Sequence, residues 1–254
     1  MEQSHYHLFN EIQESHWWFQ ARNQIVAALL DKHLAALPLD SQNHSGAQRC
    51  LIDVGCGTGA MLPMLARFGR VYGIDSEPEA IALCRQRGCE DVFLADDAQW
   101  RDKRYDVLTF FDVIEHVDDD SGMLSHYLRW LKPGGLVMIT VPAFMFLWSE
   151  HDEINHHRRR YTKKQLANLI AASGLQLDRI SYYNSLLFPP IAFLRVLKKL
   201  VPTKARPPRS DFELSSPLIN TALKTIFASE RFWLRRFSFP AGLSLLCVAR
   251  KPNG

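Results

Sequence analysis

A short apolar run that ends in three alternating glycines constrains the fold of this 254-residue chain more than any other feature. Residues 51–54 read Leu-Ile-Asp-Val, Gly55, Gly57 and Gly59 follow, and an apolar helical pattern resumes over residues 61–68. Glycine permits positive φ and a close approach of the backbone to a ligand, and the start of a helix offers free N–H groups. The pattern therefore predicts a strand, a glycine-rich turn and a helix that together hold a ligand.

Two kinds of nucleotide-binding turn compete for this segment, and the spacing of the glycines separates them. The dinucleotide fingerprint is G-x-G-x-x-G, whereas this turn reads G-x-G-x-G and follows Asp53 inside the strand. The spacing disfavours a dinucleotide. A glycine-rich turn alone is a weak signal, because many such turns have only a structural role.

Acidic residues at the ends of the next apolar runs extend the pattern. Asp75 ends the run 70–75, and a carboxylate there can accept hydrogen bonds from both hydroxyls of a ribose. Capping of a helix at 78–86, shared with Ser76, is compatible with that role. A third run at 91–94 leads into Asp97 and Ala98, although acids in a loop are usually only solvated.

Two further segments complete a recognisable series. A fourth strand is predicted at 105–111 and continues into Asp-Val-Ile-Glu-His-Val at 112–117, while Leu-Lys-Pro-Gly-Gly at 131–135 turns into a fifth strand at 136–141. In this order and spacing the signals resemble the class I S-adenosylmethionine-dependent methyltransferases, in a UbiE/UbiG-like small-molecule branch. The match covers roughly residues 50–145 and is more specific than any one motif.

The resemblance implies an α/β fold with a Rossmann-like, seven-stranded, mostly parallel sheet and an antiparallel edge strand. We expect a helical lid over residues 1–45, a core over 46–184 and 242–254, and a helical insertion over 185–241 between the last two strands, 175–183 and 242–251. S-adenosylmethionine is the implied cofactor. The residues expected to bind it are Asp53, Gly55, Cys56, Gly57, Gly59, Asp75, Ser76, Asp97, Ala98 and Asp112.

The N-terminal segment combines aromatic residues with a cation. His-Trp-Trp-Phe at 16–19 precedes Arg22 and an apolar helical run at 25–30. Dense aromatic residues usually pack in a core. The resemblance implies instead a helix that closes over the site, in which Trp18 and Arg22 contact the acceptor and Arg22 neutralises a carboxylate.

The segment after the fifth strand leaves the sheet at its carboxyl edge, where open α/β folds bind ligands. We expect Phe144 and Trp148 to line the acceptor pocket. Deprotonation of the acceptor would fall to an imidazole oriented by Asp152, although histidines in polar loops are more often surface residues. A metal at His151, Asp152, His156 and His157 is disfavoured by their spacing, so we expect no metal. The expected catalytic residues are His151, His156, His157 and Tyr161.

Charge and apolar residues are concentrated in the C-terminal half. Residues 151–209 contain 12 Lys and Arg against 3 acids, although the whole chain carries only +3. The insertion continues with an apolar, basic helix at 191–200, a Pro-rich linker at 202–217 and an amphipathic helix at 218–237. Helices of such an insertion more commonly pack on the sheet, but residues 186–209 could also lie on an anionic membrane surface. The uncharged run at 180–194 is too short to span a bilayer.

Five cysteines without a CxxC pair favour a reducing compartment, and nothing near the N-terminus resembles a signal peptide. We therefore expect a cytoplasmic protein, peripheral at most to the inner face of the membrane. The sequence does not set the oligomeric state. The expected function is methyl transfer to a small-molecule or lipid-linked acceptor, at oxygen before nitrogen or carbon. An RNA or protein methyltransferase and a non-catalytic S-adenosylmethionine-binding, membrane-associated protein remain alternatives, with nucleic acid not the first choice.

Overall fold

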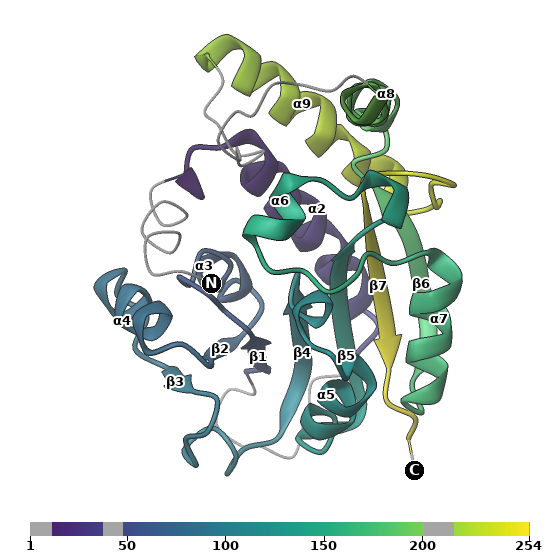
Figure 1. Cartoon of the computed structure of the whole chain (residues 1–254). Coiled ribbons are helices and arrows are strands. Elements are labelled where there is room, and N and C mark those ends of the chain that lie inside the picture. Colours follow the sequence, from purple (N-terminus) through teal and green to yellow (C-terminus); the bar gives the residue numbers. More distant parts are fainter. Residues whose placement is uncertain (1–11, 38–47, 201–215, 254) are drawn as a thin grey trace.

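A single seven-stranded sheet organises the chain (Figure 1). The computed structural model describes residues 12–37, 48–200 and 216–253. The strands lie in the order β3-β2-β1-β4-β5-β7-β6, and β7 runs antiparallel to both of its neighbours. Their bounds are β1 Cys50–Val54, β2 Arg70–Asp75, β3 Val92–Leu94, β4 Tyr105–Phe111, β5 Leu131–Pro142, β6 Gln176–Tyr183 and β7 Ser244–Arg250.

The expected Rossmann-like sheet is confirmed, and the apolar runs explain it. Strands covered by helices on both faces read as continuous apolar segments, as in the Leu-Val-Met-Ile-Thr-Val run of β5. The antiparallel strand β7 lies one position inside the edge, and β6 is the edge strand. Strand β5 begins earlier than expected, at Leu131, because Leu131 already pairs with Tyr105 of β4. The register then shifts, and the next pair is Val107 with Leu136.

The two faces of the sheet are covered by different helices. Neighbouring strand residues alternate between the faces, so Leu136 and Met138 pack on one side while Val137 and Ile139 pack on the other. The first side is covered by α2 (Trp17–Leu34), α3 (Leu62–Leu65) and α9 (Pro217–Leu234), and the second by α5 (Asp120–Tyr127) and α7 (Lys163–Ala172). Near β3, α4 (Pro78–Gln86) contributes to a smaller cluster.

Helix α2 is part of the core for most of its length. Ala21, Ile25 and Leu29 are fully buried against the sheet. The apolar residues of this helix therefore follow the core interpretation, whereas the aromatic residues of its first turns line the functional cavity described below. Closure of the N-terminal segment 1–45 over the site as a lid stays a prediction. Residues 1–11 of this segment lie outside the described part of the chain.

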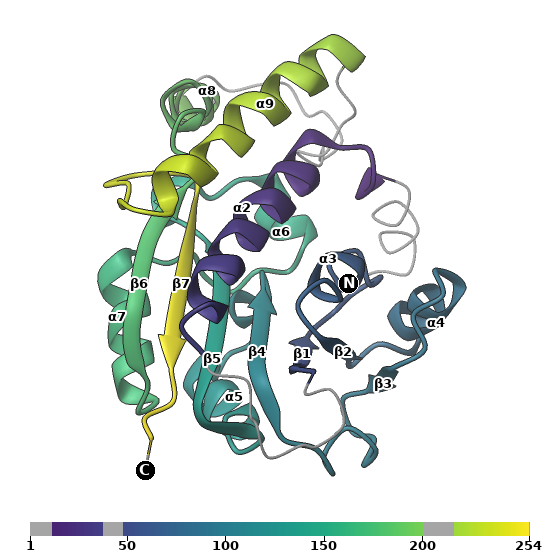
Figure 2. The ribbon, with the colours of Figure 1, turned by 180° about the vertical axis from the view of Figure 1, so that it is seen from behind.

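The insertion contains α8 (Phe188–Leu200) and α9, and α9 packs along α2 (Figure 2). The Trp17 backbone N–H donates to Asn220 Oδ1 at 2.8 Å, and the ring of Trp17 meets Phe227 edge-on at 5.9 Å. Glu230 accepts hydrogen bonds from the N–H groups of Ser185 and Leu186 at 2.6 and 2.8 Å. Helix α9 is thus anchored to the sheet.

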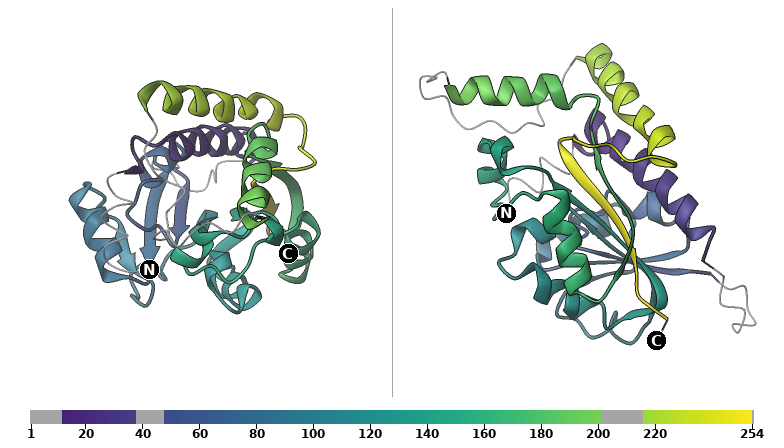
Figure 3. Two further views of the ribbon diagram at one scale, coloured as in Figure 1. Left: turned by 45° about the horizontal axis from the view of Figure 1, so that its top comes forward. Right: turned by 90° about the vertical axis from the view of Figure 1, so that its right-hand side faces the viewer.

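Helix α8 lies beyond the carboxyl ends of the parallel strands (Figure 3). Its outer surface exposes Phe193, Val196 and Leu197. Most of the Pro-rich linker falls at 201–215, outside the described residues. Among the described helices, none has the length and apolar character that crossing a bilayer would need.

Helix α7 begins with a pair of reciprocal side-chain caps. Thr162 caps the helix through its hydroxyl, which accepts from the Gln165 N–H, while the Gln165 side chain accepts from the Thr162 N–H at 2.8 Å. This reciprocal pair is a capping box. The helix consequently begins at Lys163, directly after the segment that carries the histidines.

Candidate functional site

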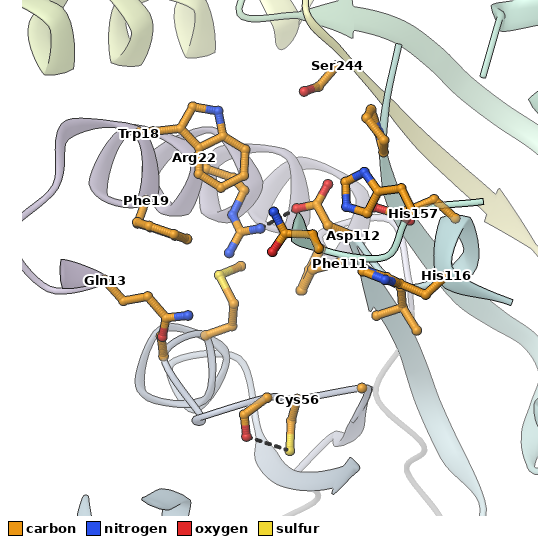
Figure 4. A pocket seen from close by; sticks show the side chains of 18 of the residues that line it. Gln13, Trp18, Phe19, Arg22, Cys56, Phe111, Asp112, His116, His157 and Ser244 are labelled. Atoms are coloured by element: carbon orange, nitrogen blue, oxygen red, sulfur yellow. Dashed lines mark hydrogen bonds and ion pairs between the residues drawn. The ribbon is translucent and has the colours of Figure 1, made fainter. Parts of the chain in front are cut away.

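A cavity of about 740 Å³ lies at the carboxyl ends of β1, β2, β4 and β5. Its walls come from these strand ends, the first turns of α2, the segment around α6 (Glu150–Ile154) and one side of α8. Figure 4 shows Arg22 reaching toward Asp112, with Gln13 and Phe19 on one side and His116 and His157 on the other. A volume of this size is within the range of pockets that bind cofactors and other small molecules.

The glycine turn borders this cavity. Gly55, Gly57 and Gly59 all have positive φ, at 71°, 55° and 79°. A Cβ on Gly55 would meet Val113 at 2.7 Å and one on Gly59 would meet Cys84 at 2.9 Å, whereas nothing lies within 4 Å of a Cβ on Gly57. Two glycines are therefore required by packing, and Gly57 leaves space open on the cavity side.

Asp75 connects the turn to the end of β2. Its carboxylate accepts from the Gly57 N–H at 2.9 Å and from the Glu77 N–H at 3.0 Å. Burial raises its pKa. Ser76 also lines the cavity, but Glu77 occupies the N-cap position of α4 that was expected for the Asp75 and Ser76 pair.

Asp53 lies at the base of the turn. It is buried and accepts a hydrogen bond from the Thr109 hydroxyl at 2.6 Å. Burial raises its pKa to about 7, against the opposing effect of that hydrogen bond. Asp53 and Cys56 both line the cavity, as expected, whereas Gly59 acts behind the lining through its backbone conformation.

Asp112 follows β4 with a positive φ of 57°, which is uncommon for a residue with a side chain. Its carboxylate accepts from the Arg22 guanidinium, which is itself buried and lies 4.6 Å from the centroid of the Trp18 ring. The structure thus joins a residue expected at the cofactor to two expected at the acceptor. Arg22 already has a carboxylate partner, so the charge it neutralises is that of Asp112.

Asp97 and Ala98 are not among the residues that line the cavity. Asp97 accepts from the Leu94 N–H at 3.0 Å, which closes the turn after β3, and Ala95 lines the cavity instead. Contact of Asp97 and Ala98 with the cofactor stays a prediction.

His151, His156 and His157 all line the cavity. His157 Nδ1 lies 2.8 Å from Asp152 Oδ1, and the fully buried Asp152 also accepts from Arg160 at 2.8 and 2.9 Å. Although burial acts to raise the pKa of Asp152, the hydrogen bonds from His157 and Arg160 hold it well below its ordinary range. Asp152 therefore orients His157, as the sequence suggested.

Three other expected site residues are placed elsewhere. Tyr161 donates to Asp120 at 2.7 Å, and burial together with this bond raises its pKa. Phe144 stacks on Tyr182 with ring centroids 4.8 Å apart. Neither of these residues nor Trp148 is among those lining the cavity, so their contacts in the structure are structural ones.

Comparison with known proteins decides the family. Residues 18–180 match the family described as "Methyltransferase domain", which is more than half of the chain. The chain belongs to this methyltransferase family. Membership agrees with the resemblance seen in the sequence and confirms S-adenosylmethionine as the cofactor.

The methyltransferase has distant relatives of named activity. It is 26% identical, over 52% of its length, to the ubiquinone biosynthesis O-methyltransferase of Hydrogenovibrio crunogenus, and spans 57% of that protein. It is 27% identical, over 65% of its length, to a probable S-adenosylmethionine-dependent methyltransferase of Mycolicibacterium smegmatis, and spans 62% of it. The chain therefore spans only part of the curated relatives that it matches.

Among solved structures, a SAM-dependent methyltransferase from Archaeoglobus fulgidus has the same fold. The TM-score is 0.52 and the identity 18%, with 90% of this chain and 94% of that chain covered. At this identity the likeness concerns the fold alone.

The residues around the glycine turn of the methyltransferase fit S-adenosylmethionine. The open space beside Gly57, and the lining carboxylates of Asp53, Asp75 and Asp112, provide room and acceptors for a ligand with hydroxyl and ammonium donors. These residues would hold the cofactor together with Gly55, Cys56 and Ser76.

Sequence reasoning missed several lining residues, and Glu115 matters most. It is fully buried on the 3-10 turn Ile114–His116, and neither carboxylate oxygen has a hydrogen-bond partner among the described residues. Burial, with a smaller effect from Asp112, raises its pKa well above the ordinary value. The available signal was an acid inside the 112–117 segment, of which only Asp112 was expected at the cofactor.

Gln13 was also missed, and it accepts from the Thr58 hydroxyl at 2.7 Å across the cavity. Nothing in the sequence around Gln13 marks it as a partner of the glycine turn. The contact depends on how the chain before α2 returns over that turn.

Proposed function

We propose that this methyltransferase transfers the methyl group of S-adenosylmethionine to a hydroxyl oxygen of a small molecule. The observation that carries the proposal is the contact between His157, which lines the same cavity as the glycine turn, and the buried Asp152 behind it. A candidate proton acceptor, His157, therefore lies in the wall of the cofactor cavity although it follows Gly59 by 98 positions in the sequence.

The chain's contribution to such a reaction is alignment and proton transfer. When bound, S-adenosylmethionine supplies an electrophilic methyl group. A hydroxyl acceptor must lose its proton, and a positioned imidazole contributes roughly 10²- to 10⁴-fold to such a step. Asp152 fixes the orientation of His157 through Nδ1, which leaves Nε2 for the acceptor. The buried aromatic wall around Phe19 and Phe111 excludes water.

The relatives support oxygen as the methylated atom. Several are named ubiquinone biosynthesis O-methyltransferases, although their identity to this chain is low and the matched segments cover about half of it. An RNA or protein methyltransferase would bind S-adenosylmethionine through the same residues, but no observation on the described residues favours RNA or protein as the acceptor.

An apolar acceptor agrees with the walls of the cavity. Trp17, Trp18 and Phe19 line it from α2, and Ile191 and Leu194 line it from α8. On the same helix, Phe193, Val196 and Leu197 are exposed to solvent. We therefore extend the proposal to a lipid-linked acceptor, reached from the inner face of a membrane by a cytoplasmic protein whose segment 186–209 contacts the lipid surface.

A transfer assay with radiolabelled S-adenosylmethionine tests the proposal. The full chain is incubated with fractionated cell extract, and the label is followed into solvent-soluble, aqueous, RNA and protein fractions. We expect label in a solvent-soluble or small aqueous product, stable to conditions that cleave methyl esters. H157A should lower the rate by roughly 10²-fold or more, whereas the exposed control H126A should not.

Two outcomes contradict the proposal. Label found only in RNA or protein would assign the other substrate class. Absence of transfer with every fraction, in a protein that binds S-adenosylmethionine, would favour a non-catalytic binding protein.

A further inference from the structure

Glu115, His116 and His157 bring three metal-ligand atoms together at the wall of the cavity. One carboxylate oxygen and two imidazole nitrogens lie within 4.8 Å of one another. Three atoms at that separation share a point about 2.8 Å from each, and shifts of less than about 1 Å reach the 2.0–2.2 Å of zinc bonds. The set combines neighbouring residues of one turn with a histidine from the segment after α6.

The unpartnered carboxylate of Glu115 is the observation that points to a ligand. Its side chain is fully buried, and both of its oxygens lack a hydrogen-bond partner among the described residues. Buried polar groups are nearly always satisfied, because leaving one unpaired costs the free energy of desolvation. A cation at this point would satisfy the carboxylate.

The surroundings of both histidines match those of metal ligands. A histidine that binds a metal usually uses its second ring nitrogen to contact a carboxylate or a backbone carbonyl, and this contact fixes the ring. His157 contacts Asp152 Oδ1 at 2.8 Å through Nδ1, and Arg160 in turn holds Asp152. His116 interacts with the backbone of Asn155. The rings of the two histidines meet edge-on at 4.7 Å.

We propose that Glu115, His116 and His157 bind a divalent transition-metal cation of the Zn²⁺ type, with an open coordination position that faces the cavity. Two nitrogen ligands disfavour Mg²⁺ and Ca²⁺, which take oxygen ligands, and two histidines with one carboxylate form a known catalytic zinc set. This ligand set differs from the one weighed in the sequence, because Asp152 contacts His157 and Arg160 instead of a common metal point.

The cation gives the acceptor hydroxyl a second way to lose its proton, and this step rests on the proposed function. A hydroxyl oxygen bound at the open position has a lowered pKa. Its O–H bond breaks, the electron pair stays on oxygen, and the proton passes to water. His157 then acts as a ligand of the cation and no longer as the proton acceptor.

Titration of the metal-free full chain with Co²⁺, followed by its visible absorption, tests the site directly. We expect one Co²⁺ per chain, with the bands of a four- or five-coordinate ion, and displacement by Zn²⁺. E115Q and H157A should weaken binding roughly 100-fold or more, and D152N roughly 10-fold. H126A, which replaces an exposed histidine of α5, serves as the matched control and should bind as the wild type.

Circular dichroism and urea denaturation are measured for every variant, and a cooperative transition with an unchanged spectrum for E115Q shows an intact fold. Failure of the wild type to bind Co²⁺ or Zn²⁺ stoichiometrically would overturn the inference, as would unchanged metal binding in E115Q. Neither result depends on methyl transfer. A metal-binding chain that methylates no acceptor would contradict the proposed function while leaving the site in place.

Discussion

Arg22 of α2 donates to the carboxylate of Asp112, 90 residues later at the end of β4. Arg22 is buried beneath the Trp18 ring, and Asp112 holds a positive φ. The ion pair therefore connects the first turns of α2 to the end of β4, which borders the cofactor cavity. Folding of the N-terminal helix and formation of the site depend on the same contact.

Replacement of Arg22 by Met should reduce both stability and cofactor affinity. Removing one partner of a buried pair costs about 3–5 kcal/mol in the extreme, and we expect about 2 kcal/mol because Asp112 is partly exposed. Chemical denaturation and titration with S-adenosylhomocysteine measure the two effects. R70M removes the exposed Arg70–Asp91 pair, whose attraction is screened by water and salt, and should lower the stability much less than R22M does. Equal losses in the two variants would contradict this role of Arg22.

Gly57→Ala separates backbone strain from occupation of the cavity, because the chain offers a matched glycine. Gly57 and Gly88 both have positive φ, at 55° and 80°, and a Cβ on either would meet nothing within 4 Å. Only Gly57 lines the cavity. We expect both substitutions to cost about 1–2 kcal/mol of stability, from the left-handed conformation. Only G57A should lose affinity for S-adenosylmethionine, by at least roughly 10-fold.

Calorimetric titration of G57A and G88A with S-adenosylmethionine measures whether only G57A loses cofactor affinity. If G88A loses cofactor affinity to the same extent, the effect comes from strain transmitted through the fold. If G57A binds normally, the cofactor does not lie against this turn.

The sheet and the cofactor turn were predictable because each depends on a local pattern. Strands buried on both faces need continuous apolar runs, and β2 and β4 begin and end where those runs do. Asp75 is positioned by the end of its strand and by the turn beside it. For such residues the neighbouring sequence carries the physical constraint.

The acceptor side was less predictable, because its geometry depends on distant parts of the chain. Glu115 and His157 are brought together only when the segment after β5 returns over the end of β4. Phe144 has a positive φ of 57°, which breaks the alternation of β5 and directs its ring to Tyr182. Tyr161 donates to Asp120 of α5 because the same segment after β5 returns over this part of the fold. No pattern within 142–161 encodes these tertiary contacts.

Glu230 gives the stability a pH dependence of known sign. It is buried on α9, and burial raises its pKa from 4.5 to about 7. Between these values the folded protein keeps a proton that the unfolded chain has lost, so this group makes the free energy of unfolding fall as pH rises from about 4.5 to 7. Relative to E230Q, which cannot titrate there, the wild type should lose stability over this range and stay level above it.

Urea denaturation at a series of pH values measures this difference between the wild type and E230Q. Asp53 titrates in both proteins and cancels from the comparison. The exposed substitution E90Q should leave the pH dependence unchanged. Parallel curves for the wild type and E230Q would show that Glu230 is not protonated in the folded state.

The exposed surface of α8 yields the prediction for membrane contact. Phe193, Val196 and Leu197 are exposed beside Lys199, whose ammonium donates to the Phe146 carbonyl at 2.8 Å. Phe146 and Met145 of the 3-10 turn Met145–Leu147 are themselves half exposed, so apolar side chains from two elements lie near basic groups. An apolar surface with adjacent cations is typical of attachment to anionic lipid.

We expect the full chain to sediment with vesicles of phosphatidylglycerol and phosphatidylcholine and to be released by high salt, because salt screens the attraction of the cations. The double variant F193S/L197S should bind at least roughly 10-fold more weakly, since each large apolar side chain contributes about 1.5–3 kcal/mol when buried. L177S, which replaces an exposed leucine of the edge strand β6, is the matched control and should bind as the wild type. Binding that F193S/L197S leaves unchanged would place the contact elsewhere, and a wild type that ignores vesicles would limit the acceptor to soluble molecules. Unchanged methylation of a water-soluble acceptor by F193S/L197S would show that the substitutions affect the surface and not the cavity.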